Sequence, residues 1–240
     1  MKQVIPKIIH QTFPTNRLSE ALQENVNKIK SENPDYAYRF YNDKDVEDYI
    51  FDAYGSEFLD IYHHINPKYS AARIDYFRYL LLFNEGGVYL DIKASLTKPL
   101  SNIIKSDDRY ILSQWDNTDI NSRGWGNHLS LVDLGLEEFQ NWFIMSARSH
   151  KFLYEVLMDV IQNLYMYDHT LDGVGRHAVL HTTGPVAYTK TIAPILHLHP
   201  HRFAPSNKLL GVKYSIYDDA AHRRLFAIHY SNQTEPLVLK

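Results

Sequence analysis

The sequence predicts an α/β fold in which helices flank a mainly parallel central sheet. Short apolar segments, typical of buried strands, alternate with longer segments whose apolar residues recur at helical spacing. At 240 residues the chain is long enough to bury a sizeable core. No repeat, linker or low-complexity segment interrupts it. We therefore expect a single domain over residues 1–240, with one half over about 1–114 and a second over about 115–240.

The predicted elements follow in order along the chain. Apolar segments predict strands at residues 4–12, 36–41, 88–92 and 110–115, with edge strands within 208–230. Helical spacing predicts helices at residues 18–33, 43–65 with a break near Gly55, 70–85 and 150–165. Residues 116–128 are polar, contain two glycines and show no periodicity, which predicts a loop.

Residues 70–100 contain a predicted helix that leads directly into a strand. Ser70 is in position to cap the helix. Gly86 and Gly87 are expected to end it, because glycine adopts the left-handed backbone conformation at low cost. Chemistry-bearing side chains are denser here than elsewhere in the chain.

Four charged side chains meet at this helix-to-strand connection. Asp75 and Arg78 lie three apart and share a helix face, whereas Asp91 and Lys93 alternate with apolar residues and share a strand face. All four are therefore expected to point away from the core. Carboxylates accept hydrogen bonds from sugar hydroxyls, and Arg and Lys neutralise phosphate. Solvated surface ion pairs produce the same spacing, so the spacing alone leaves both interpretations open.

The motifs of this stretch resemble those of a known family. They are Ile74-Asp75-Tyr76-Phe77-Arg78-Tyr79, then Gly86-Gly87-Val88-Tyr89-Leu90-Asp91-Ile92-Lys93, then Lys98-Pro99-Leu100. Their order resembles the signature of the Och1-like glycosyltransferases, glycosyltransferase family 32. Four further segments resemble that family: IPKIIHQTFP at 5–14, NPDYAYRFYND at 33–43, NWFIMSARSHKFL at 141–153 and TTGP at 182–185.

The resemblance implies a GT-A type, Rossmann-like fold and an enzyme that moves a hexose from a nucleoside-diphosphate sugar to a saccharide hydroxyl. It also implies retention of anomeric configuration. The first half would bind the donor and the second half the acceptor. The implied donor-site residues are Phe13 on the nucleobase, Asp43, Asp75 on donor hydroxyls, Arg78 on the diphosphate and Asp91 on the ribose. For Phe13 a role in the core is the alternative to stacking on the nucleobase, because an aromatic side chain at the end of a buried strand commonly packs inside.

The chain departs from the family at Lys93. In the family this position is usually the second acid of Asp-x-Asp, a direct ligand of Mn²⁺ or Mg²⁺. If a metal is used here, Asp91 and His229 are the candidate ligands. We hypothesise that the Lys93 ammonium replaces the metal wholly or in part, and that Arg78, Asp91 and Lys93 form the catalytic group. The alternative is a Lys93–Asp91 ion pair in a degenerate nucleotide- or glycan-binding protein. A phosphoesterase that uses Asp91 and histidines is a further alternative, but the sequence shows no convincing two-metal cluster for it.

Acceptor-side candidates lie in the second half. Trp125, in the predicted loop, presents a ring face suited to the C–H face of a pyranose. Asn141 resembles a family position near the reacting sugar, with a buried amide as the alternative, and Trp142 is expected in the core. His197, His199 and His201 alternate but have no acid nearby, so we expect packing rather than a metal site.

Composition restricts the partners. The formal net charge of −3 does not favour nucleic acid or anionic membrane as the main partner. The chain has no cysteine, which excludes disulfides and thiolate zinc sites. No apolar stretch approaches the roughly 18 residues of a membrane span, and no leader precedes the first strand, so we expect a cytoplasmic protein. The donor base and sugar, the acceptor and the oligomeric state are not encoded in any of these patterns.

Overall fold

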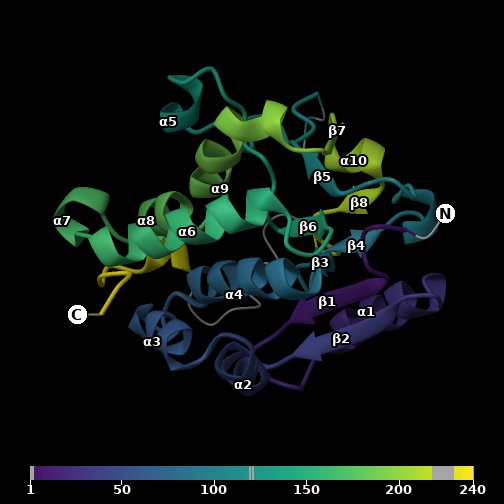
Figure 1. Cartoon of the computed structure of the whole chain (residues 1–240), viewed down its shortest axis with the longest axis horizontal. Coiled ribbons are helices and arrows are strands. Elements are labelled where there is room, and N and C mark those ends of the chain that lie inside the picture. Colours follow the sequence, from purple (N-terminus) through teal and green to yellow (C-terminus); the bar gives the residue numbers. More distant parts are fainter. Residues whose placement is uncertain (1–2, 119, 121, 218–229, 240) are drawn as a thin grey trace.

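The central sheet is mainly parallel, as predicted. The computed structural model describes residues 3–118, 120, 122–217 and 230–239. Within them, six strands form the sheet in the order β2-β1-β3-β6-β5-β7 (Figure 1). Their bounds are β1 (Ile8–Thr12), β2 (Ala37–Tyr41), β3 (Gly87–Leu90), β5 (Tyr110–Ser113), β6 (Phe143–Ser146) and β7 (Arg202–Ala204). All neighbours are parallel except at β6, which runs antiparallel to both β3 and β5.

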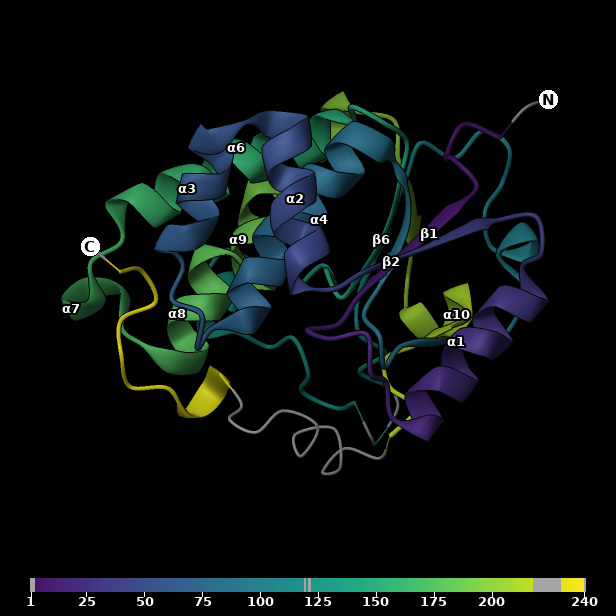
Figure 2. The same cartoon turned by 90° about the horizontal axis from the view of Figure 1, so that it is seen from below.

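The described helices cover both faces of this sheet. Their bounds are α1 (Glu20–Glu32), α2 (Asp43–Tyr54), α3 (Ser56–His64), α4 (Ser70–Glu85), α5 (Leu129–Val132), α6 (Lys151–Met166), α7 (His169–Asp172), α8 (Gly175–Thr182), α9 (Pro185–Ile192) and α10 (Asn207–Leu210). Short 3-10 helices in the described ranges span Leu100–Asn102, Ala193–Leu198 and Tyr230–Asn232. Figure 2 shows α2, α4 and α6 on one side of the sheet and α1 and α10 on the other. No helix in the described part of the chain has the length and apolar character that crossing a membrane requires.

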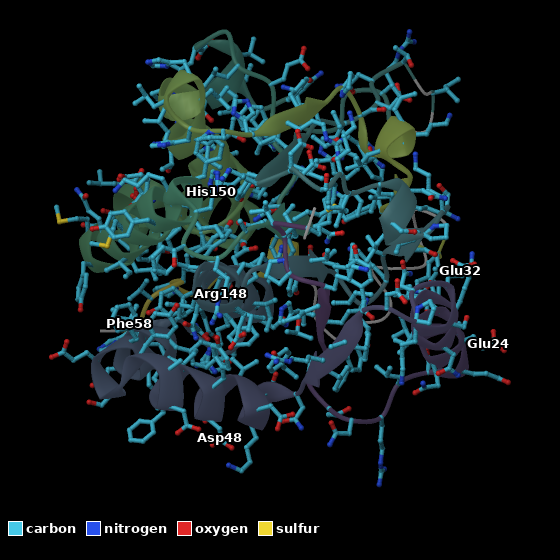
Figure 3. All side chains as sticks on the ribbon, turned by 45° about the vertical axis from the view of Figure 1, so that its right-hand side comes forward. Glu24, Glu32, Asp48, Phe58, Arg148 and His150 are labelled. Atoms are coloured by element: carbon cyan, nitrogen blue, oxygen red, sulfur yellow. The ribbon has the colours of Figure 1, made fainter. Side chains whose placement is uncertain are left out.

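Helix α1 shows how apolar spacing fixes a helix to the sheet. Leu22, Val26 and Ile29 are buried on one face, as their spacing predicts. Glu24 and Glu32 lie on the outer side of the helix (Figure 3). The helix ends at Glu32, before Pro34, as predicted.

Helix α2 places its first turn at the end of β2. Asn42 forms a capping box, because its side chain accepts a hydrogen bond from the Asp45 N–H and the Asp45 side chain accepts one from the Asn42 N–H. Gly55, with φ of +85°, separates α2 from α3, so the predicted break is confirmed. Asp43 thereby lies directly beyond the carboxyl end of a parallel strand.

The α4–β3 connection depends on two glycines. Gly86 and Gly87 have φ of +64° and +102°, and a Cβ on Gly86 would lie 2.7 Å from the Arg148 backbone N. The predicted end of the helix is confirmed. Its predicted cap is wrong, because the Tyr69 carbonyl already accepts hydrogen bonds from the backbone N–H groups of Ala72 and Arg73. Ser70 is therefore the first helical residue and not the cap.

Several predicted strands are shorter than expected, and one segment differs. The first strand begins at Ile8 and not at residue 4. Pro6 lies between them, and because it has no N–H it cannot donate to a strand ladder. The described residues of the predicted 208–230 segment, 208–217 and 230, do not form edge strands of the central sheet. The described part of this segment holds the end of α10 and β8 (Val212–Lys213), which pairs only with β4 (Ser95–Leu96) in a separate two-stranded sheet. Residues 218–229 lie outside the described residues.

Candidate active site

A cavity of about 800 Å³ opens at the carboxyl ends of the parallel strands. Phe13, after β1, Asp43, after β2, and Asp91, after β3, all line it. Parallel strands gather their carboxyl ends at one edge of a sheet, where ligands of α/β proteins bind. The structure thus brings together three residues that the sequence placed at strand ends, and their roles in binding stay predictions.

Arg78 is the centre of the polar group in this cavity. Its Nη1 lies 3.4 Å from Asp75 Oδ1, and its Nη2 lies 3.1 Å from Asp91 Oδ1. Nη1 also donates to the Asn141 carbonyl at 2.5 Å. The guanidinium carbon lies 4.5 Å from the centre of the Tyr89 ring. One cation therefore holds both acids of the predicted cluster.

The expectation that these charges point away from the core is wrong for Asp75 and Arg78, each of which is only 5 % exposed. Burial is tolerated because the two side chains pair with each other and with polar partners. Asp91 and Lys93 do not share a strand face either, because β3 ends at Leu90 and the Ala94 N–H donates to the Asp91 carbonyl in a turn.

Asp75 has a second set of partners. The Asn141 side-chain amide donates to its Oδ1 at 3.1 Å, and the Thr183 hydroxyl donates to its Oδ2 at 3.1 Å. The same amide donates to the Tyr79 hydroxyl at 2.9 Å. Burial raises the pKa of Asp75 to about 7, with the Arg78 charge acting in the opposite direction. Asn141 is thus a buried amide bonded to side chains, and it also lines the cavity.

Lys93 is held by an aromatic side chain and not by Asp91. Its Nζ donates to the Tyr214 hydroxyl at 2.9 Å and lies 4.1 Å from the centre of that ring. No carboxylate of the described residues lies within 4.0 Å of Lys93 Nζ, so the Lys93–Asp91 ion-pair alternative is not found there. Burial lowers the pKa of Lys93, and the nearby Asp91 charge opposes that shift.

The residues around Asp91 bear on the divalent ion that the family resemblance implies. Asp91 Oδ1 already pairs with Arg78, and the second motif position carries an ammonium. Mn²⁺ and Mg²⁺ need several oxygen ligands. Across the described ranges, no group of three His, Cys, Asp or Glu side chains is placed to hold a metal. These residues therefore do not fit a divalent ion held by protein side chains at Asp91, and His229 lies outside the described residues.

Three tryptophans and Tyr214 form an aromatic cluster in the cavity wall. The Tyr214 ring centre lies 5.1 Å from that of Trp115, 5.5 Å from that of Trp125 and 5.3 Å from that of Trp142. Trp125 lies at the cavity, as its proposed acceptor role requires. Trp142 is buried as predicted, and its Nε1 has no hydrogen-bond partner among the described residues.

A buried acid that the sequence analysis did not single out lies in the same wall. Glu138 is 6 % exposed. Its Oε1 accepts from Trp115 Nε1 at 2.6 Å, and its Oε2 lies 2.5 Å from His128 Nε2. No spacing in LEEFQNW distinguishes Glu138 from its exposed neighbour Glu137. Tyr214 was likewise missed, because it lies 121 residues from the Lys93 that it contacts.

Two of the three alternating histidines pack, as expected. His197 lies in a 3-10 helix that ends at Leu198. The His199 and His201 rings pack against Phe152, with ring centres 5.7 Å and 5.5 Å away. His199 and His201 thus pack in the fold, whereas His197 is exposed.

Comparisons with known proteins agree with the motifs. Residues 19–110 match the family described as glycosyltransferase sugar-binding region containing DXD motif. The chain is 36 % identical over 102 residues to mannosyl phosphorylinositol ceramide synthase SUR1 of Saccharomyces cerevisiae, covering 42 % of this chain and 26 % of that protein. It is 28 % identical over 206 residues to the initiation-specific alpha-1,6-mannosyltransferase of Candida albicans, covering 78 % of this chain and 52 % of that protein.

A solved structure supports the fold. The UDP-bound glycosyltransferase domain of the YGT toxin superimposes with a TM-score of 0.56 at 10 % identity, covering 92 % of this chain and 85 % of that one. The fold is that of GT-A glycosyltransferase domains, which confirms the predicted fold, and the match over residues 19–110 confirms the resemblance to the family. The matched residues include Asp91 and, two positions later, Lys93. It spans between a quarter and about half of the length of the two yeast relatives.

Proposed function

We propose that this chain transfers a hexose from a nucleoside-diphosphate sugar to a hydroxyl of a saccharide or glycoconjugate acceptor. The observation that carries the proposal is the placement of Arg78, Asp91 and Lys93 in one cavity at the carboxyl ends of parallel strands. Cations bind a diphosphate there, and carboxylates accept hydrogen bonds from ribose or sugar hydroxyls. The names of the yeast relatives make mannose the first sugar to test.

Arg78 and Lys93 have different roles in this proposal. Both Nη atoms of Arg78 are engaged, one by Asp91 and the other by Asp75 and the Asn141 carbonyl. Arg78 therefore fixes Asp91 and supplies positive charge from within the wall. The Lys93 ammonium has three donors, and Tyr214 accepts from only one of them. Lys93 is thus the cation that contacts the diphosphate directly.

The remaining donor contacts follow from the position of each side chain at the cavity. Phe13 stacks on the nucleobase, and Asp43, exposed at the first turn of α2, accepts from the nucleoside. Asp91 accepts from the ribose, and its side chain is 24 % exposed and so accessible to a ligand. Asp75, held by Asn141 and Thr183, accepts from hydroxyls of the transferred sugar.

The proposed reaction is a front-face displacement that retains configuration. The bond between the anomeric carbon and the diphosphate oxygen breaks, and the acceptor oxygen bonds to the same face of that carbon. The acceptor proton passes to the departing diphosphate oxygen. Lys93 and Arg78 stabilise the charge that develops on the diphosphate. No protein nucleophile is needed, and a product with inverted configuration by NMR would contradict this mechanism.

Thermal stability in the presence of UDP- and GDP-sugars tests the proposal, with each donor measured in EDTA and in Mn²⁺. A ligand at about 100 times its Kd stabilises the folded state by about 2.7 kcal/mol. We expect one donor to stabilise the protein in EDTA, and Lys93→Met to abolish that effect. Lys213→Met removes an exposed lysine next to Tyr214 that does not line the cavity, and serves as the matched control.

The outcomes separate the alternatives. Stabilisation that requires Mn²⁺ and survives Lys93→Met would refute Lys93 as the diphosphate cation. Donor binding without hydrolysis or transfer would favour a degenerate nucleotide- or glycan-binding protein of the same fold. If no nucleotide sugar stabilises the chain, the transferase proposal itself fails.

A further inference from the structure

Glu138 is a charged group in the cavity wall that the donor site does not use. The carboxylate is buried, which is costly unless both oxygens are hydrogen-bonded. Trp115 and His128 supply one partner to each oxygen. An ionised carboxylate has about four acceptor positions, so roughly two remain. Glu138 and both of its partners line the cavity, where a ligand can reach those positions.

Charge decides which part of a ligand Glu138 can meet. A carboxylate repels a diphosphate, so Glu138 must face a neutral part that donates hydrogen bonds. The rings of Tyr214 and Trp115 lie between Glu138 and Lys93. Tyr214 accepts a hydrogen bond from Lys93, and Trp115 donates one to Glu138. The centres of the two rings lie 5.1 Å apart. Glu138 is therefore in the same cavity as the diphosphate cations but is not part of that group.

The surroundings of Glu138 match the chemistry of a pyranose. Trp125 packs edge-on against Trp115, with ring centres 4.9 Å apart, and both rings line the cavity. Indole faces pack against the C–H face of a sugar ring, while a carboxylate accepts from hydroxyls at its rim. The donor sugar already has the Asp75 and Asn141 group, so the Glu138 group is left for a second sugar.

The loop over residues 122–128 holds this group in place. Gly126 has φ of +74°, and a Cβ there would lie 2.5 Å from Trp115 Cδ1 and 3.0 Å from Glu138 Cβ. His128, at the end of the same loop, bonds to the carboxylate. Glycine is thus required for the loop to pack on both side chains.

We propose that Glu138 binds hydroxyls of the acceptor pyranose, with Trp115 and His128 as positioning residues. This inference rests on the proposed function and extends it to the acceptor. It makes Glu138 a residue that determines acceptor affinity without contributing to donor binding.

Intrinsic fluorescence can test the inference directly, because the chain has three tryptophans and all three line this cavity. The probes are UDP, GDP and the methyl α- and β-pyranosides of mannose, glucose and galactose, each titrated alone and with saturating nucleotide. The variants are Glu138→Gln, which removes the charge, and Glu138→Asp, which retains it but withdraws the carboxylate by one methylene. Glu137→Gln, at the exposed neighbouring position, is the matched control.

We expect at least one glycoside to change the fluorescence of the unaltered protein. Its affinity should fall about tenfold or more in Glu138→Gln, as loss of hydrogen bonds to a charged group predicts, and fall measurably in Glu138→Asp. Nucleotide affinity should stay within about twofold in both variants, and Glu137→Gln should bind like the parent.

Two results would overturn the inference while leaving the proposed function intact. In the first, the unaltered protein binds a nucleotide but its fluorescence responds to no glycoside. In the second, Glu138→Gln and Glu138→Asp fold and bind the glycoside as tightly as the parent does. Failure of the unaltered protein to bind any nucleotide would refute the proposed function, and this inference with it.

Discussion

Replacement of Arg78 by methionine tests whether one buried cation stabilises the site. Arg78 pairs with Asp75 at 3.4 Å and with Asp91 at 3.1 Å, and its side chain is 6 % exposed. Methionine has a similar length but no charge, so both acids lose their partner. Removal of one member of a buried ion pair typically costs about 3–5 kcal/mol, which is a large part of the roughly 5–15 kcal/mol stability of a domain.

The loss should depend on pH in a defined direction. Burial raises the pKa of Asp75 to about 7 in the parent, and Arg78 opposes the shift, so its removal raises that pKa further. A buried acid with a raised pKa keeps its proton in the folded state, and stability falls with rising pH until the folded-state pKa is reached. That decline ends near pH 7 in the parent and continues above it in the variant. The Asp75-linked part of the loss therefore grows by up to about 1.4 kcal/mol per pH unit above pH 7.

Urea unfolding at pH 6.0 and pH 8.5 measures both effects. Arg39→Met is the matched control, because Arg39 is 44 % exposed and pairs with Glu85 at 3.5 Å, so the expected loss is below about 1 kcal/mol. Adding Asp75→Asn to Arg78→Met should restore part of the stability at pH 8.5, since it removes an unpaired buried acid. A loss below about 1 kcal/mol at both pH values, or one that shrinks at high pH, would refute the reasoning.

Two further predictions concern stability elsewhere in the fold. Burial lowers the pKa of His150 to about 4, so the stability that the neutral side chain contributes is lost as pH falls from about 6.5 to 4. His150→Asn, which can still cap α6, should reduce this loss of unfolding free energy by up to about 3 kcal/mol in urea unfolding. An unchanged dependence of stability on pH would contradict this. Gly126→Ala should destabilise the protein by about 1–3 kcal/mol and shift the emission of Trp115. Gly124→Ala, at φ of +82° but with nothing within 4 Å, should leave the emission unchanged, and equal effects of the two substitutions would contradict a steric cause.

Local signals predicted the order of the elements. Gly55 and Gly86 mark helix ends in the sequence because both take positive φ, and Pro34 limits α1 from outside. These features act within a few residues of the boundary that they set. Residues 208–230 carry no comparable signal, and pairing of β8 with β4 brings together segments more than 100 residues apart. Local spacing does not contain that information.

Sequence spacing indicated that charged residues gather near the cavity, but it did not indicate that they are buried. Helical spacing placed Asp75 and Arg78 on one face, yet whether that face is buried depends on partners such as Asn141 and Thr183, 66 and 108 residues from Asp75. Lys93 likewise contacts Tyr214, which is distant in sequence, where the sequence offered an ion pair with Asp91 as one alternative. Polar residues buried by long-range pairing follow no periodicity, and Glu138 was missed for this reason.

The charge balance of the site leads to a last prediction, on donor affinity. With Asp75 protonated, the group of Arg78, Asp91 and Lys93 carries one net positive charge, and with Asp75 ionised the four side chains sum to zero. A bound diphosphate is a negative charge near Asp75, so it favours the protonated carboxyl, whose pKa of about 7 lies within the measurable range. The affinity for a nucleotide sugar, whose diphosphate diester does not titrate near neutrality, should fall as pH rises from 6 to 8.5, by up to about tenfold per unit above pH 7. Isothermal titration at several pH values measures the slope, and Asp75→Asn should flatten it. A slope that persists in Asp75→Asn would assign the titration to another group, and affinity that rises with pH would mean that the ionised carboxylate is the form that binds the donor.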